Sequence, residues 1–163
     1  MGQLLDADAA RVVAELRLAP HPEGGYYRET YRSPLRLATT RGDRAAVTTI
    51  HFLLPSGAFS AFHRVQSDEV WVHTAGDALE LHTLCADGGH DVRVLGGAGS
   101  MASMHAVVPA TRWQAARPLG RYALATCVVA PGFEFADLEL ARRSDIARAF
   151  PGLPDAVLSL ALP

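Results

Sequence analysis

The feature that most constrains the fold is a series of short apolar segments, each of which ends at turn-forming residues. Between residues 46 and 130, segments rich in valine, leucine, threonine and aromatic residues alternate with glycine, proline, aspartate and serine. Short strands separated in this way are typical of β-sandwiches and β-barrels. The central part of the chain is therefore predicted to be all-β, with strands near 46–54, 59–65, 69–74, 79–84, 92–95, 106–108, 112–116 and 122–130.

The two ends of the chain carry a helical pattern instead. Apolar residues recur with helical spacing over residues 9–16, with Asp8 as the expected N-cap and Pro20 as the stop. Near the other end, Ser144 is expected to cap a second short helix that stops before Pro151. A chain of 163 residues is long enough for one domain with its own core. We predict a single domain with a helix at about 8–17, a barrel at about 24–138 and a helix at about 144–150.

The composition excludes several kinds of chemistry. The chain has no lysine, so it forms no lysine Schiff base and has no Walker lysine for a phosphate. Its formal net charge is −2 with no basic or acidic block, which argues against nucleic acid or an anionic membrane as a partner. Acidic residues near the start and the lack of a long apolar run predict neither a signal peptide nor a membrane span, hence a cytoplasmic protein. Cys85 and Cys127 lie in apolar segments and are expected to be buried free thiols.

A histidine and a glutamate stand out among the side chains that could do chemistry. If Gln66 is the centre of a hairpin turn, His63 faces Glu69 across the two strands, and directly opposed Cβ atoms are about 5 Å apart. Strand alternation also places Trp71 and His73 on the face that carries Glu69. The pair is then either an exposed ladder on an ordinary hairpin or, if this face lines a barrel, a desolvated imidazole–carboxylate pair.

The sequence around this pair resembles the metal-binding cupin pattern G-x5-H-x-H-x3–4-E-x6-G. Residues 57–76 fit every spacing in the pattern, but Val65 stands where the second histidine belongs. Residues 107–115 are similar to the second cupin motif, with Gln114 in the position of the third histidine and Thr111 in that of a glycine. The chain therefore resembles a cupin whose metal site is altered.

One branch of the cupin superfamily is more similar still, from about residue 18 to about residue 151. The chain resembles the cupin_5 (DUF985) family in the segments 20–26, 59–64, 67–69, 108–109 with 113–115, and 130–137. The resemblance implies a double-stranded β-helix, which is the cupin jelly-roll barrel. It also implies a homodimer, because exposed sheet edges need covering.

Three functions fit these residues, and the first is a metal-independent enzyme. Resemblance to the sugar-nucleotide epimerases among cupins implies an isomerase-like, epimerase-like or cyclase-like activity on a carbonyl-containing metabolite or sugar derivative. His63 would be the base, Glu69 would orient it, and Tyr27 or Tyr122 would be the acid. The residues expected to hold the small-molecule substrate are Gln114, Trp71, Glu23, His51 and His73.

The second function is a metal-dependent cupin, either a dioxygenase or an isomerase, with His63, Glu69 and Gln114 as ligands. Transition metals usually need three or four firm ligands. This set has two strong ligands and a weak amide oxygen, which His51 or His73 would have to supplement. We therefore expect no cofactor, with a divalent metal as the alternative. The third function is a non-catalytic module that binds a carbohydrate or another small metabolite in the same pocket.

Overall fold

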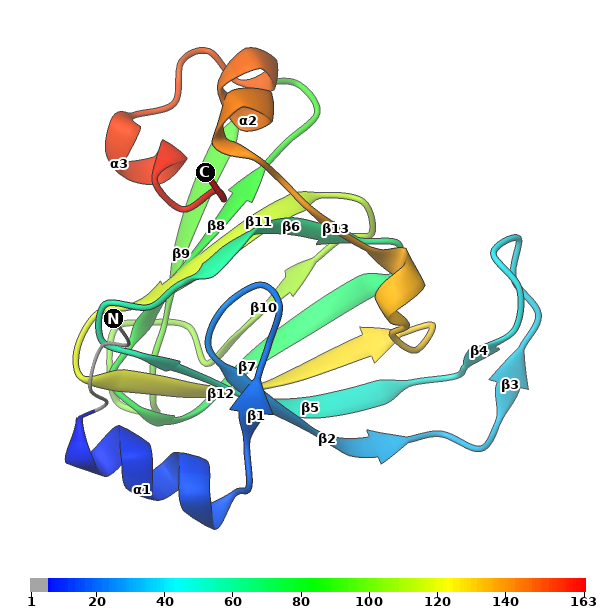
Figure 1. The fold of residues 1–163 in the computed structure, drawn as a ribbon, viewed down its shortest axis with the longest axis horizontal. Helices are drawn as coiled ribbons and strands as arrows, with labels where there is room; N and C mark the ends of the chain where they lie inside the picture. Colours follow the sequence, from blue (N-terminus) through cyan, green and yellow to red (C-terminus); the bar gives the residue numbers. More distant parts are fainter. Residues whose placement is uncertain (1–5) are drawn as a thin grey trace.

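The computed structural model describes residues 6–163 and consists of two antiparallel β-sheets that face each other (Figure 1). The sheets form a jelly-roll barrel with short helices near both ends of the chain, so the predicted fold class is confirmed. The expectation about a signal peptide depends in part on residues 1–5, which lie outside the described residues. No helix within residues 6–163 is both long enough and apolar enough to cross a membrane.

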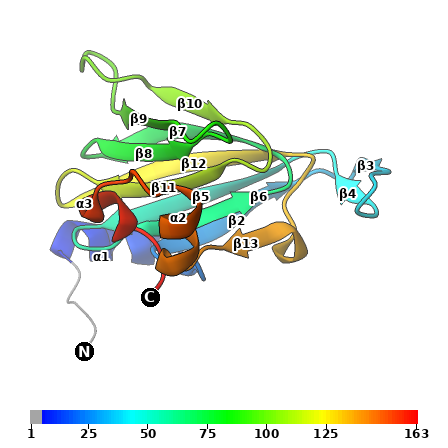
Figure 2. The ribbon, with the colours of Figure 1, turned by 90° about the horizontal axis from the view of Figure 1, so that it is seen from above.

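Within the described residues the larger sheet contains, in spatial order, β1 (Ala19–Pro20), β2 (Tyr26–Arg32), β5 (Thr48–Pro55), β12 (Tyr122–Ala130), β7 (Asp68–Gly76) and β10 (His105–Val108). The smaller sheet contains β13 (Leu138–Leu140), β6 (Ser60–Val65), β11 (Trp113–Pro118), β8 (Leu79–Leu84) and β9 (His90–Leu95). A separate hairpin of β3 (Arg36–Leu37) and β4 (Arg44–Ala45) projects away from the barrel (Figure 2). The helical segments are α1 (Ala7–Glu15), η1 (Phe135–Asp137), α2 (Arg143–Ala149) and α3 (Asp155–Leu158).

Helices cover the outer faces of both sheets (Figure 1). Val12 of α1 packs with Leu53 and Leu124 of the larger sheet, whereas α2 and α3 pack on the smaller sheet. The N-cap of α1 is Asp6, whose carboxylate accepts a hydrogen bond from the backbone N–H of Asp8 at 3.0 Å, so the expected Asp8 cap is wrong. Ser144 likewise lies inside α2 and does not cap it.

The apolar core fills one end of the barrel and leaves the other end open. Along β5 the inward side chains change from Leu54 and Phe52 at one end to Ile50 and Thr48 at the other. The ring of Phe52 meets Trp71 edge to face, with centroids 5.6 Å apart. Burying a large apolar side chain stabilises the fold by about 1.5–3 kcal/mol, so the filled end holds the sheets together while the other end is free to form a site.

The predicted hairpin between residues 60–65 and 69–74 is wrong. β6 pairs with β11 and β13, and β7 pairs with β12 and β10, so the two segments belong to different sheets. The cross-strand partners of His63 are Gln114 and Leu140, and those of Glu69 are Val129 and Val108. The short connection at Gln66 therefore carries the chain from one sheet to the other. His63 and Glu69 instead approach each other from opposite walls of the barrel.

Candidate active site

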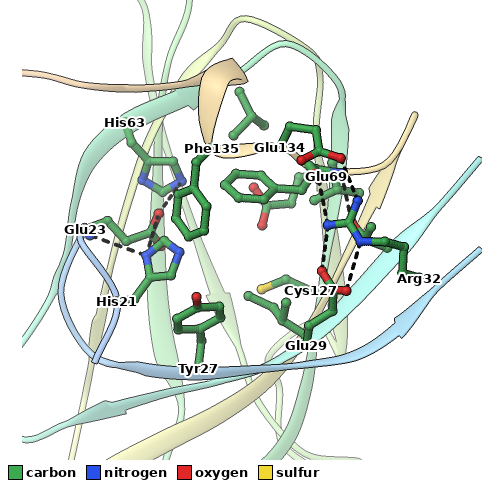
Figure 3. Close-up of a pocket in the computed structure, with 15 residues that line it drawn as sticks. His21, Glu23, Tyr27, Glu29, Arg32, His63, Glu69, Cys127, Glu134 and Phe135 are labelled. Atoms are coloured by element: carbon green, nitrogen blue, oxygen red, sulfur yellow. Dashed lines mark hydrogen bonds and ion pairs between the residues drawn. The ribbon is translucent and has the colours of Figure 1, made fainter. Parts of the chain in front are cut away.

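A cavity of about 120 Å³ opens at the unfilled end of the barrel, between the two sheets (Figure 3). Its inner wall carries titratable side chains, its mouth carries an arginine between two glutamates, and the remaining wall is apolar and aromatic. The lining residues are His21, Glu23, Tyr27, Glu29, Arg32, Thr48, Ile50, His63, Val65, Glu69, Cys127, Val129, Phe133, Glu134 and Phe135.

A glycine turn places Glu23 against the inner wall. Gly24 has a φ of +107°, and a Cβ there would collide with the carbonyl oxygen of Phe59, so only glycine fits. The carbonyl of Glu23 accepts a hydrogen bond from the backbone N–H of Ala61 on β6 at 2.7 Å. The buried carboxyl group then accepts a hydrogen bond from the Ser60 hydroxyl at 3.0 Å. The loop thus delivers a carboxyl group to the side chains of β6.

His63 is almost fully buried, with 1% of its surface exposed, and its ring has a defined orientation. Its Nδ1 lies 2.8 Å from the carbonyl oxygen of Ala61. A carbonyl only accepts hydrogen bonds, so Nδ1 carries the proton and the lone pair of the neutral ring is on Nε2. Nε2 lies 3.4 Å from Oε2 of Glu23. His63 therefore presents a basic nitrogen on the side of the ring that faces a carboxyl group.

Burial shifts the pKa values of these three groups toward their neutral forms. It raises the pKa of Glu23 to about 8, although the hydrogen bond from Ser60 opposes this shift. It raises the pKa of Glu69 to about 7, against the attraction of His63. Burial also lowers the pKa of His63, an effect that the charge of Glu69 opposes. Since the acid has the higher pKa, the Glu23–His63 contact at neutral pH joins a neutral carboxyl group and a neutral imidazole.

Two predicted residues, Gln114 and Trp71, lie behind the cavity wall and hold Glu69 in place. The indole N–H of Trp71 donates to Oε1 of Gln114 at 2.9 Å, which fixes the orientation of the amide because an indole nitrogen cannot accept. The amide nitrogen of Gln114 then donates to Oε2 of Glu69 at 2.6 Å. Neither residue lines the cavity. The prediction that they contact the substrate is therefore not supported by their position, and they instead hold the carboxyl group of Glu69 in place.

The other predicted residues divide between the cavity and the rest of the barrel. Tyr27 lines the cavity and directs its hydroxyl group into it (Figure 3). Tyr122 lies at the far end of β12 and packs in the cluster beneath α1. His51 alternates with the inward residues of β5 and so lies on the outer face of the sheet. His73 lies toward the filled end, with Nε2 3.0 Å from the carbonyl oxygen of Asp77. Tyr122, His51 and His73 therefore do not reach the cavity.

Several lining residues have no predicted role in the site. One of them is His21, whose Nδ1 lies 3.6 Å from Oε2 of Glu23. Burial, together with the proximity of His63, lowers the pKa of His21 to about 4. The alternation of side chains along β2 places Glu29 on the same face as Tyr27, so the sequence could have indicated Glu29. A bulge after Glu29 then shifts the register of β2 and brings Arg32 inward. Residues 133–135 belong to the segment 130–137 that carries part of the family resemblance, and they form part of the mouth.

The donor set does not fit a cupin metal centre. Val65, which lines the cavity, supplies no ligand in the position of the second histidine. The amide oxygen of Gln114 is held by Trp71, and its nitrogen faces Glu69. Within residues 6–163 no three histidine, cysteine, aspartate or glutamate side chains converge as a metal-binding group. The side chains instead form an acid–base cluster.

Comparison with known proteins agrees with this fold. A family model described as "Cupin superfamily (DUF985)" matches residues 10–141. The chain is a DUF985 cupin. A hypothetical protein from Leishmania major is 29% identical to this cupin, with a TM-score of 0.86 over 94% of this chain and 98% of that chain. The X-ray crystal structure of a Shewanella oneidensis protein is 30% identical, with a TM-score of 0.87 over 98% and 99% of the two chains.

A more distant likeness concerns the fold alone. An oxalate decarboxylase from Bacillus subtilis is 13% identical to this cupin, with a TM-score of 0.56 over 86% of this chain and 36% of that chain. Comparison with curated proteins gave no match. The chemistry of this cupin therefore has to be argued from its own side chains.

Proposed function

We propose that this cupin is a metal-independent enzyme that moves a proton on a small, carbonyl-containing metabolite, as isomerases and epimerases do. The observation that supports the proposal is the placement of His63 in an enclosed cavity between two carboxyl groups, Glu23 and Glu69. The pKa values of these carboxyl groups are about 8 and about 7. Groups that titrate near neutral pH are suited to both accepting and donating protons.

The geometry supports a specific assignment of roles. Nε2 of His63 would accept a proton from the carbon next to the carbonyl group, because Nδ1 is already bonded to Ala61. The C–H bond breaks, its electron pair forms a C=C bond to the carbonyl carbon, and the π pair of the carbonyl group moves to its oxygen to form an enolate. The carboxylate of Glu69 would stabilise the resulting imidazolium. Tyr27 extends from the opposite sheet and would donate a proton or a hydrogen bond to the enolate.

Hydrogen exchange with solvent tests this proposal without knowledge of the product. The protein would be incubated in D₂O with ketoacid amides, hydroxyketones, lactones and small sugars, and deuterium next to the carbonyl group would be followed by NMR. We expect the protein to accelerate exchange in at least one compound. Binding without any exchange would favour the non-catalytic module, and exchange that a chelator abolishes would favour a metal enzyme.

The two predicted tyrosines provide a matched pair of variants. Tyr27→Phe removes the hydroxyl group that lies in the cavity, so we expect the exchange rate to fall roughly tenfold or more. Tyr122→Phe removes a hydroxyl group near α1 and should leave the rate unchanged. Rates would be measured at saturating substrate and at equal protein concentration. Equal rates for the two variants would remove Tyr27 from the mechanism.

A further inference from the structure

Arg32 at the mouth of the cavity already uses four of its five N–H donors within the protein. It is the only permanently charged cation among the described residues that line the cavity. Nε and Nη2 donate to the two carboxylate oxygens of Glu29 at 3.0 and 2.8 Å, and Nη1 donates to Glu134 at 2.8 Å (Figure 3). Nη2 also donates to the carbonyl of Phe133 at 3.1 Å. The fork that would otherwise bind a carboxylate or phosphate is occupied.

The inner wall of the cavity also disfavours an anion. Glu23 and Glu69 are the carboxyl groups closest to His63, and any negative charge they carry repels an anionic ligand. The two cavity histidines provide no compensating charge, because burial lowers the pKa of both His21 and His63. An anion that entered the cavity would lose its hydration without gaining a free cation as a partner, and this desolvation costs free energy.

The size and walls of the cavity restrict the ligand further. A cavity of 150 Å³ lined by apolar side chains holds benzene, and this cavity measures about 120 Å³. A ligand with as many non-hydrogen atoms as benzene, about six, therefore fills it. The walls away from the acid–base cluster are apolar or aromatic, contributed by Ile50, Val65, Val129, Tyr27, Phe133 and Phe135. Such walls suit a compact ring or short carbon chain.

We infer that the cavity takes a compact, uncharged carbonyl compound and rejects anions, and that Glu29 and Glu134 set this preference by occupying Arg32. The inference rests on the proposed function in taking this cavity as the substrate site. It separates this cupin from enzymes that bind dicarboxylates or nucleoside diphosphates, since both kinds of ligand need a free cation.

Isosteric pairs of neutral and anionic probes test the preference directly. Pyruvamide and pyruvate have the same number of non-hydrogen atoms and the same carbonyl group, and isobutyramide and isobutyrate form a second pair of the same size. Dissociation constants would be measured by NMR titration of the full-length protein at pH 7.5. We expect each amide to bind roughly tenfold more tightly than its carboxylate. The inference would be overturned if the carboxylates bound more tightly than the amides, or if none of the four compounds bound.

Freeing Arg32 should reverse the preference. In the double variant Glu29→Gln/Glu134→Gln, the guanidinium keeps its neighbours but loses both counter-charges, so the affinity for pyruvate and isobutyrate should rise roughly tenfold. The control variant Glu80→Gln/Glu139→Gln removes the same total charge from two arginine–glutamate pairs outside the cavity, and it should leave the affinity for both anions unchanged. Unchanged anion affinity in the first variant would overturn the role of Glu29 and Glu134. Ligand affinity is measured separately from hydrogen exchange. A failure of the proposed activity can therefore be distinguished from a failure of the proposed preference for uncharged ligands.

Discussion

Replacing His63 with alanine should lower the rate of hydrogen exchange about 10²–10⁴-fold, which is the usual contribution of a positioned general base. His63 lines the cavity, and its unprotonated nitrogen is Nε2, beside Glu23, because Nδ1 is bonded to Ala61. The neighbouring carboxyl groups cannot replace it without moving, since Glu69 is held by Gln114 and Glu23 by Ser60. The loss should appear in kcat more than in KM, because the proton is transferred only in the transition state.

Two controls separate chemistry from folding in the His63 variant. His51→Ala is the matched substitution on the outer face of β5, outside the cavity, and should keep the wild-type rate. Added imidazole should restore part of the activity of the His63 variant, because the substitution leaves a space of the size of the missing ring. Unfolding curves would confirm that the variant is folded at the assay temperature. A folded His63→Ala protein with the wild-type exchange rate would exclude the mechanism.

The barrel could be predicted from sequence because its signals are local. Each strand is marked by its own apolar residues and ends at its own turn, and each cupin motif is one continuous stretch of sequence, residues 57–76 and 107–115. The sequence therefore predicts His63, Glu69, Tyr27 and Glu23 as site residues without predicting their spatial arrangement, and all four line the cavity. Whether they act in catalysis remains a prediction.

The features of the site that could not be predicted from the sequence are those that depend on how the strands pair. Consecutive strands usually form a hairpin, but here Gln66 connects two sheets, so His63 and Glu69 meet across the barrel rather than across a ladder. The bulge in β2 reverses the alternation after Glu29 and hides Arg32 from a period-two pattern. Neither effect has a marker in the residues themselves, because both arise from pairing with distant segments.

The second large effect concerns stability, which should fall as pH rises from about 6.5 to 8. The pKa of Glu23 is about 8 in the folded protein and 4.5 as its ordinary value. Between these values the unfolded chain has released the proton while the folded chain retains it, so rising pH favours unfolding until the folded pKa is passed. Glu69, with a pKa of about 7, acts in the same direction up to that pH. From Glu23 alone we expect the free energy of unfolding to fall by about 2 kcal/mol between pH 6.5 and pH 8.

The histidines act in the opposite direction and at lower pH. The pKa values of His21 and His63 are lowered from 6.5 by burial. The unfolded chain therefore binds their protons first as pH falls below about 6.5, and stability is lost on acidification. The carboxyl groups thus dominate above pH 6.5, and this is the interval in which the effect of Glu23 can be isolated.

Glu23→Gln should remove most of this dependence and make the protein more stable than the wild type at pH 8. Glutamine resembles the protonated carboxyl group: its oxygen can accept the bond from Ser60, and its amide N–H can face Nε2 of His63. The free energy of unfolding would be measured by denaturant titration at several pH values between 6.5 and 8. Glu139→Gln, at an exposed carboxylate paired with Arg64, should retain the wild-type slope. Parallel wild-type and Glu23→Gln curves would show that Glu23 is ionised in the folded protein throughout this interval, which would contradict the contact between a neutral Glu23 and a neutral His63.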